Sequence, residues 1–366
     1  MRIVQLLPEL NEGGVERGTV ELNRELIKRG YQSIVISAGG KLVDEIIKDG
    51  GEHVTFDVCS KNPLTFPLRM IKLRAILKKL NPTILHARSR VPAWLTYVAN
   101  KKLHFPFVTT VHGLNSINAY SKIMTKSDQV ITVSEVVRDY IIEGYGVNKD
   151  KITVIQRGVD TEKFSTDNID KNFTDTFKKE HQLNDKFIIS SVGRVTWLKD
   201  YETYIKSIAL VKKDIPNIVG LIVGGVREDK KEYFESLKKL AEKEGVSKEI
   251  IFTGSQTKIA EIYAMSDILV NASLKMGNVA RTVTESLAMN TPVIATTFEG
   301  LNNLIEDEVN GAIIETQNTN NLAEKILYLE KNMPQNVKET LPHEFTLNAL
   351  VESTINVYNL FKENEK

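Results

Sequence analysis

The chain has few of the features that mark secreted or membrane-spanning proteins. It contains one cysteine among 366 residues, Cys59, so no internal disulfide can form and a reducing compartment is expected. No apolar run approaches the ~18–20 residues of a membrane-spanning helix. The N-terminus opens into an apolar strand pattern at residues 2–7, without the pattern of a signal peptide. We therefore predict a cytoplasmic protein. Its length predicts two hydrophobic cores.

Acidic residues are missing from much of the first half. No Asp or Glu occurs between Val58 and Ser127, although the chain has 47 acids and a net charge of +1. Two interpretations remain open for residues 61–126. They form a solvated basic face, or they face an anionic partner: a membrane surface, a lipid-linked phosphate or an acidic saccharide. The cations are Lys61, Arg69, Lys72, Arg74, Lys78, Lys79, Arg88, Arg90, Lys101, Lys102, Lys122 and Lys126. No nucleic-acid partner is predicted.

The usual phosphate-binding signatures are absent. The spacing of Gly13, Gly14 and Gly18 fits neither GxGxxG nor GxxxxGK[ST], which weakens a nicotinamide or flavin site and excludes a P-loop. Gly13-Gly14 nevertheless lies between a predicted strand and a predicted helix at 15–29. Glycines there let a ligand approach the backbone, and a helix N-terminus favours anionic oxygens. The alternative is a tight turn that needs positive φ.

Short apolar runs alternate with helical patterns along the chain, which predicts parallel sheets covered by helices on both faces. Ligands of such sheets bind beyond the carboxyl ends of the strands. With two doubly wound domains, the expected site is a cleft where the strand ends face each other. The predicted strands are residues 2–7, 33–37, 54–56, 84–86, 107–111, 129–133, 152–155, 187–192, 218–223, 250–253, 268–271, 292–295 and 312–314.

Composition also suggests where the domains divide. Residues 164–185 are rich in Asn, Asp, Thr and Lys, have no strand pattern and lie near the middle of the chain. We predict an N-terminal domain at 1–165 and a second domain at 183–345. An amphipathic helix at about 347–361, within a terminal segment 346–366, is predicted to pack back on the first domain.

Two cations follow the strand at 187–192. Arg194 comes directly after its terminal glycine, and Lys199 five residues later. Fixed cations behind a strand end can neutralise the charge of a leaving diphosphate in place of a metal. No DxD-type acidic pair is placed to hold Mg²⁺, so no metal site is predicted. The alternative is that both are surface cations on a loop.

Further candidates occur near strand and helix ends. His112, before Gly113 at the end of the strand at 107–111, can donate to a sugar hydroxyl or change charge near neutral pH. His86, Arg88 and Arg90 follow the preceding strand and are candidates for the same crevice. Glu285 begins an apolar helix, where its carboxylate can accept both hydroxyls of a ribose or merely compensate the helix N-terminus.

Together these motifs resemble the retaining glycosyltransferases of family 4, which have the GT-B fold. They occur in family order over essentially the whole chain, and their combination is specific for the family but silent on the sugar. The matching pieces are Gly13-Gly14-Val15-Glu16-Arg17, His112-Gly113, Val133-Ser134, Gly158-Val159-Asp160 with Phe164, Gly193-Arg194 with Lys199, residues 281–288, and Thr291-Pro292-Val293-Ile294-Ala295.

The resemblance implies that residues 1–165 form the acceptor-side domain and residues 183–345 the nucleotide-sugar-binding domain. It also implies a role for each matching position. Arg194 and Lys199 would bind the donor diphosphate and act in catalysis, and Gly13-Gly14 would contact the diphosphate from the other domain. Within residues 281–288, Arg281 and Glu285 would bind the donor, Glu285 through the ribose. His112 would contact the donor sugar near the reacting carbon.

Two positions depart from the family pattern. Gly277 stands where the family has a glutamate that contacts the donor sugar, eight residues before Glu285. Where a glycine pair is common after the strand at 292–295, this chain has Glu299-Gly300. Glu299 is our candidate for the missing donor-binding carboxylate. These changes affect sugar choice and catalytic competence more than nucleotide binding.

The leading hypothesis is a metal-independent, retaining hexosyltransferase without a cofactor. It would move a sugar from a nucleotide diphosphate sugar to a glycan or lipid-linked acceptor, in cell-surface glycan or lipopolysaccharide synthesis. Residues 68–80, with apolar and basic side chains, would dock on the inner face of the membrane, or form a buried helix with a basic wet face. A catalytically impaired nucleotide-sugar-binding protein is the alternative, made plausible by Gly277. Other GT-B enzymes, such as an epimerase or a phosphorylase, fit the motif order poorly.

Overall fold

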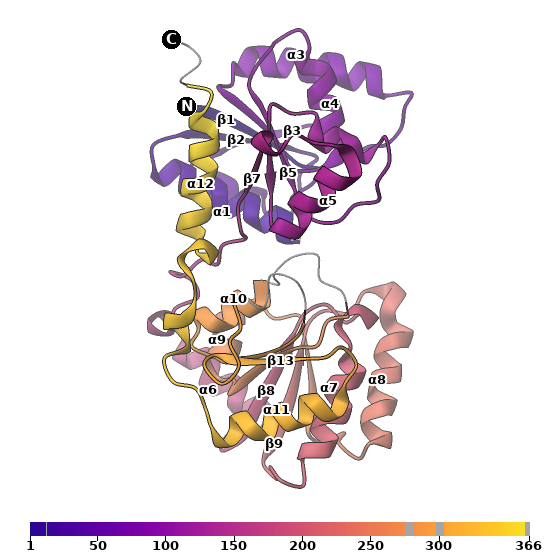
Figure 1. The fold of residues 1–366 in the computed structure, drawn as a ribbon, viewed down its shortest axis with the longest axis vertical. Coiled ribbons are helices and arrows are strands. Elements are labelled where there is room, and N and C mark those ends of the chain that lie inside the picture. The colour runs from indigo at the N-terminus through magenta and orange to yellow at the C-terminus, as the bar shows by residue number, and fades with distance from the viewer. Residues whose placement is uncertain (12, 275–280, 298–303, 363–366) are drawn as a thin grey trace. The chain divides into compact units, whose positions relative to one another are not determined.

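A computed structural model describes residues 1–11, 13–274, 281–297 and 304–362. The chain divides into two compact units, each built on its own parallel sheet (Figure 1). Unit 1 comprises Met1–Gln156 together with Leu347–Lys366, and unit 2 is Arg157–Thr346. None of the described helices has the length and apolar character needed to cross a bilayer.

Unit 1 contains a seven-stranded parallel sheet in the order β3-β2-β1-β4-β5-β6-β7. The central strands are buried along nearly their whole length, as expected for a parallel sheet covered on both faces. The strands are β1 (Arg2–Leu6), β2 (Gln32–Ser37), β3 (Glu52–Thr55), β4 (Ile84–Ala87), β5 (Phe107–Val111), β6 (Gln129–Thr132) and β7 (Ile152–Val154).

Alternate residues of these strands point to opposite faces of the sheet. On β1, Val4 and Leu6 pack against α3 (Phe66–Leu80), α4 (Arg90–Asn100) and α5 (Glu135–Tyr145). Ile3 faces the other layer, made by α1 (Gly14–Lys28) and α12 (Leu347–Asn359). The short helix α2 (Val43–Lys48) contributes Ile46 beside α1. The last helix therefore completes the first unit.

Unit 2 contains a six-stranded parallel sheet in the order β10-β9-β8-β11-β12-β13. Its strands are β8 (Phe187–Val192), β9 (Ile218–Val223), β10 (Ile250–Gly254), β11 (Ile268–Asn271), β12 (Val293–Thr296) and β13 (Gly311–Ile314). One face packs against α7 (Tyr201–Val211), α8 (Lys231–Lys243) and α11 (Thr319–Lys331). The other packs against α6 (Lys171–Glu180), α9 (Ile259–Ala264) and α10 (Arg281–Ala288).

Each predicted strand is present among the described residues, with ends that differ by at most a few positions. The division between the units differs from the predicted one. Unit 1 ends at Gln156 rather than at 165, because Val159 and Phe164 are buried in the core of unit 2 and Val159 pairs with Thr346. The polar segment 164–185 contains α6, whose Phe177 is buried against the second sheet.

Candidate functional site

In each unit the strand order reverses beside the first strand of its sheet. In unit 1 the chain moves outward from β1 through β2 to β3, then resumes on the other side at β4. In unit 2 the same reversal lies between β8 and β11. Loops on either side of such a reversal diverge and leave a crevice at the carboxyl ends of the strands, where open α/β sheets bind ligands.

Lys199 lies at the reversal point of unit 2. Its side chain crosses the end of β8 beside Gly193, where an added Cβ would lie only 2.7 Å from Lys199 Cε. Glycine at this position lets the lysine side chain lie directly against the backbone. Its Nζ donates a hydrogen bond to Ser273 Oγ at 3.3 Å, just beyond the end of β11. The two strands at the reversal point thus hold one ammonium group between them.

Arg194 and Lys199 form a cationic pair without a described counter-ion. Arg194 is exposed and Lys199 is partly buried, and neither has an ion pair with a described acid. Burial, and then the charge of Arg194, lower the pKa of Lys199. Two close cations that repel each other favour an anion with several oxygens, such as a diphosphate.

A chain of hydrogen bonds leads from Lys199 to α10. Ser273 Oγ donates to Asn271 Oδ1 at 2.6 Å, and Asn271 Nδ2 donates to Thr282 Oγ1 at 2.9 Å. Thr282 lies in the first described turn of α10, one turn before Glu285. The predicted diphosphate-binding and ribose-binding residues therefore come from directly linked elements of unit 2.

Glu285 is buried and lies one turn into α10, whose first described residue is Arg281. Arg281 Nε donates to Glu285 Oε1 at 3.1 Å, and the Tyr263 hydroxyl donates to Oε2 at 3.2 Å. A carboxylate has about four lone-pair sites, so it can accept two bonds and still accept from a ribose. Burial, followed by the charge of Glu285, raises the pKa of Tyr263, which keeps this phenol a donor.

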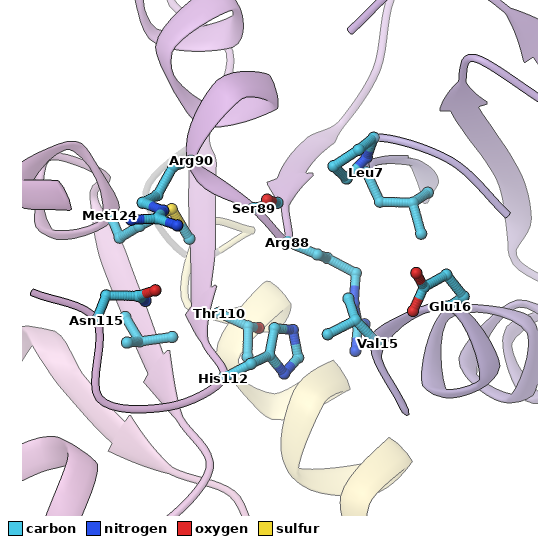
Figure 2. A pocket seen from close by; sticks show the side chains of 12 residues that line it. Leu7, Val15, Glu16, Arg88, Ser89, Arg90, Thr110, His112, Asn115 and Met124 are labelled. Carbon is cyan, nitrogen blue, oxygen red and sulfur yellow. The ribbon is translucent and has the colours of Figure 1, made fainter. Parts of the chain in front are cut away.

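Unit 1 has a cavity of about 220 Å³ at its own reversal point (Figure 2). Four groups of chain line it: the end of β1, the first turn of α1, the segment after β4, and the end of β5 with the following loop. The lining residues are Leu7, Pro8, Val15, Glu16, Arg88, Ser89, Arg90, Thr110, Val111, His112, Asn115 and Met124.

Two arginines and a histidine give this cavity its polar character. Arg88 is 8% exposed and lies beside α1, where its Nη2 would be 3.6 Å from a Cβ added to Gly18. Arg90 donates to Ser121 Oγ at 3.2 Å and lies over the ring of Tyr120. His112 follows β5, and Figure 2 shows its imidazole among the lining side chains. The structure thus brings three of the predicted crevice residues together.

Comparisons with known proteins connect both sites to one family. The family model Glycosyltransferase Family 4 matches residues 12–163, and the model Glycosyl transferases group 1 matches residues 173–343. The crystal structure of a glycosyltransferase from Rickettsia africae is similar over 99% of both chains, with a TM-score of 0.90 and 30% identity. The chain belongs to these glycosyltransferases.

Other relatives agree on the fold. The Anabaena protein HepE, solved in complex with UDP, matches with a TM-score of 0.85 at 17% identity over 98% of this chain and 99% of that one. An uncharacterized glycosyltransferase of Methanocaldococcus jannaschii is 24% identical over 96% of this chain and 95% of its own. Another from that organism is 30% identical over 57% of this chain, which spans about half of that relative's length. The glycosyltransferase therefore has the GT-B fold, as predicted.

In the structure of this glycosyltransferase, three of the positions considered in the sequence have a defined local role. Gly13 has an extended backbone (φ 166°, ψ 165°), and Gly14 begins α1 without a left-handed conformation. The interpretation of this pair as a tight turn with positive φ is therefore wrong. His86 does not line the cavity. It is buried between the Tyr358 hydroxyl and Thr110 Oγ1, both at 2.7 Å. Ser134 caps α5 by accepting from the backbone N–H of Val137.

Two predictions fall outside the described residues. Gly277, at the position of the family's glutamate, lies in 275–280, and Glu299 lies in 298–303. The role of Glu299 as a donor-binding carboxylate stays a prediction.

Sequence reasoning missed the groups that position the glycosyltransferase's Lys199. Ser273 accepts from its ammonium group, and Asn271 orients Ser273 by accepting from the serine hydroxyl. The Tyr201 hydroxyl fixes the preceding loop by donating to the carbonyl of Gly193 at 2.7 Å. The available signal was Asn271 at the end of a wholly apolar strand. A polar residue at the carboxyl end of a parallel strand points to this region of the sheet.

Proposed function

We propose that this glycosyltransferase moves a hexose from a nucleotide diphosphate sugar to an acceptor hydroxyl, with retention at the anomeric carbon and without a metal or cofactor. The observation that carries the proposal is the pair Arg194 and Lys199 at the reversal point of unit 2, without a described counter-ion. Such a pair can take the place of a metal ion in stabilising a departing diphosphate.

The chemistry assigned to the pair follows from its charge. As the bond from the anomeric carbon to the diphosphate breaks, negative charge grows on the leaving oxygen. Ser273 holds the ammonium group of Lys199, while burial and the charge of Arg194 destabilise its charged form. Negative charge that grows on the leaving oxygen therefore stabilises the ammonium group and is stabilised by it. The leaving phosphate oxygen would help take the proton of the acceptor hydroxyl, so the reaction needs no dedicated protein base.

The remaining predicted residues keep their proposed roles. Glu285 would accept hydrogen bonds from the ribose, with Arg281 and Tyr263 holding its carboxylate in place. His112 and the Gly13-Gly14 segment at the start of α1 would contact the sugar and the diphosphate. HepE, which was solved with UDP, supports a nucleotide diphosphate sugar as the donor.

The decisive experiment combines donor binding with product analysis. The full chain is screened by thermal shift against UDP, GDP, ADP and their glucose conjugates, because a bound ligand raises the unfolding temperature. The best donor is then incubated with and without EDTA, and the released sugar is followed by proton NMR. We expect donor hydrolysis that EDTA does not change and an anomeric configuration that is retained. Inversion, or loss of activity in EDTA, would contradict the proposal.

The same experiment decides the alternative function. The departure at Gly277 favours a catalytically impaired protein that still binds a nucleotide sugar. Donor binding without transfer or slow hydrolysis would establish that alternative. Absence of any nucleotide binding would contradict both.

We further propose that the acceptor is lipid-linked, in the synthesis of a cell-surface glycan or lipopolysaccharide, and that α3 rests on an anionic membrane. Leu68 and Ile71 on α3 are 56% and 57% exposed, and Leu64 just before it is 88% exposed. Three lysines extend along the same helix face: Lys72, Lys78 and Lys79. Exposed apolar groups beside lysines suit an interfacial helix.

A neighbouring cavity supports an acceptor with an apolar part. It measures about 530 Å³, lies between α3 and α4, and has mainly apolar walls that include Phe66, Trp94 and Tyr120. A lipid or isoprenoid portion of the acceptor could enter it from the membrane side.

Vesicle sedimentation tests the membrane proposal. We expect the protein to sediment with phosphatidylglycerol vesicles at low salt and less at high salt. Changing Leu68 and Ile71 together to serine should reduce sedimentation. The matched control is Leu210→Ser, which alters a 43% exposed leucine on α7 in the other unit. No binding at low salt, or equal loss with both variants, would contradict the proposal.

A further inference from the structure

Arg88 is a buried cation without a described counter-ion. It is 8% exposed, and its side chain donates one hydrogen bond within the described residues, from Nη1 to Gln5 Oε1 at 3.2 Å. Its Nε has no hydrogen-bond partner among those residues. No described carboxylate forms an ion pair with it, and the groups that favour its charge from a distance are the Tyr358 hydroxyl and then Glu21 on α1.

A buried cation without a counter-ion lowers the stability of the folded protein. A buried guanidinium normally has a carboxylate or several acceptors around it, because desolvation of its charge must be offset. Burial lowers the pKa of Arg88, because the charged guanidinium loses its hydration. Neutral Gln5 supplies only one acceptor. The described residues therefore give the Arg88 guanidinium no neighbouring anion, and the side chain lines an open cavity.

Two further features of the cavity favour an anion. Arg90, half-buried in the first turn of α4, adds a second guanidinium to the lining, nearer Met124 in Figure 2. Ser89, the residue before α4, caps none of the helix amides, and the first turn contains no acid. This contrasts with α5, whose Ser134 caps the amide of Val137. The uncapped N-terminus of α4 thus adds its positive end to the two arginines.

One acid also lines the cavity. Glu16, in the first turn of α1, is partly buried on the wall opposite the arginines' own segment. Its neighbour Arg17 is paired with Glu45 and does not line the cavity. The lining therefore has two cations against one carboxylate, and the carboxylate is not paired with either arginine.

We propose that the unit 1 cavity binds an anionic group of the acceptor, a carboxylate or a phosphate, through Arg88, Arg90 and the N-terminus of α4. This inference rests on the proposed function, since it names the class of acceptor for the transfer. Arg88 can present a planar pair of N–H groups to two oxygens of one anion, which suits either chemistry. Glu16, on the other wall, is placed to accept from hydroxyls of the same acceptor.

The inference is tested by calorimetric titration of the full chain saturated with UDP, so that other diphosphate sites are occupied. The probes are inorganic phosphate, glucuronate and the neutral control methyl glucoside. We expect at least one anionic probe to bind the unaltered protein. Arg88→Gln should weaken that binding at least about tenfold, because it removes a charge-assisted contact. Binding of methyl glucoside should not change.

Two other variants complete the test. Lys48→Gln removes an exposed cation of the same unit, on α2, and should leave anion binding unchanged. Arg90→Gln alters the less buried arginine of the cavity and replaces Arg88→Gln if that protein does not fold. The response to phosphate against glucuronate identifies which anionic group the cavity takes.

The outcomes separate this inference from the proposed function. If neither anion binds, or both bind Arg88→Gln and Arg90→Gln as tightly as the unaltered chain, the inference is overturned. If UDP itself does not bind, the proposed function fails. The anion titration is then repeated on Arg194→Ala, which lacks a cation of the unit 2 site, and the same comparison decides the cavity.

Discussion

At the scale of single residues, the two units share one device. Each places a cation without a described counter-ion where its strand order reverses: Lys199 with Arg194 in unit 2, and Arg88 in unit 1. Both are destabilised by burial, so both interact favourably with an added anion. They differ in the groups that accept their hydrogen bonds. Lys199 is held by Ser273, whereas Arg88 has the amide of Gln5.

The unit 2 pair leads to a prediction about catalysis. Arg194→Ala and Lys199→Ala should each lower kcat/KM at least ~100-fold, if each cation supplies about 2.7 kcal/mol of charge stabilisation to the departing diphosphate. The measurement is sugar transfer or donor hydrolysis at matched donor concentrations. Lys206→Ala, which removes an exposed cation on α7, is the control and should be unaffected. Unchanged turnover in the first two variants would remove them from the catalytic machinery.

At the scale of elements, α12 is tied to the first sheet by a buried polar contact. Tyr358 on α12 meets His86 on β4, which also bonds Thr110 on β5. Apolar side chains of α12 pack around that contact. His86 is neutral in this position, since burial, and then the charge of Arg88, lower its pKa well below the usual value.

This contact predicts a pH-dependent stability. Because the folded-state pKa of His86 lies below about 6.5, the unfolded chain binds a proton more readily, and stability falls as pH falls below that value. The loss should approach about 1.4 kcal/mol per pH unit for this one group until the folded-state pKa is reached. His53, whose pKa burial also lowers, adds an effect of the same sign.

The prediction is checked by urea unfolding between pH 7.5 and 5.5. His86→Gln should lose less unfolding free energy over this range than the unaltered chain, although it is less stable at pH 7.5. His53→Gln serves as the comparison, because His53 is less buried and its effect on stability should be smaller. Parallel pH profiles for the unaltered chain and His86→Gln would show that His86 does not carry the effect.

At the scale of the whole molecule, the chain leaves unit 1, builds unit 2 without interruption, and returns. Unit 2 has its own sheet and cores, whereas unit 1 needs its last helix. Burying each large apolar side chain of α12 contributes about 1.5–3 kcal/mol, so the set approaches the about 5–15 kcal/mol of a whole domain. The buried residues are Leu347, Val351, Ile355, Val357 and Tyr358.

This organisation predicts how fragments behave. Residues 157–346 alone should fold cooperatively and bind the donor nucleotide, with Lys199→Ala as the control that weakens binding. Residues 1–156 alone should not fold, because α1 and the sheet would expose the surface that α12 covers. Circular dichroism and urea unfolding of both fragments give the answer. A stable 1–156 fragment would contradict the assigned role of α12.

The local pattern of apolar and polar residues was sufficient to predict most of the strands and the two-sheet architecture. Strands such as β8 and β9 are short apolar runs between polar turns, and burial on both faces of a parallel sheet demands that composition. The helix α6 was missed because its sequence is dominated by polar and charged residues. Its apolar anchors are Phe173 and Phe177, which by themselves do not make a clear stripe.

The sequence alone determined the class of fold, the order of the motifs and the family, because each depends on patterns within a few neighbouring residues. Only the tertiary structure decided which side chains meet. Lys199 and Ser273, or His86 and Tyr358, are far apart in the chain and come together through strand order and helix packing. The same reason explains Arg88: its identity was visible in the sequence, but the scarcity of partners around it appears only once the sheet is closed by its helices.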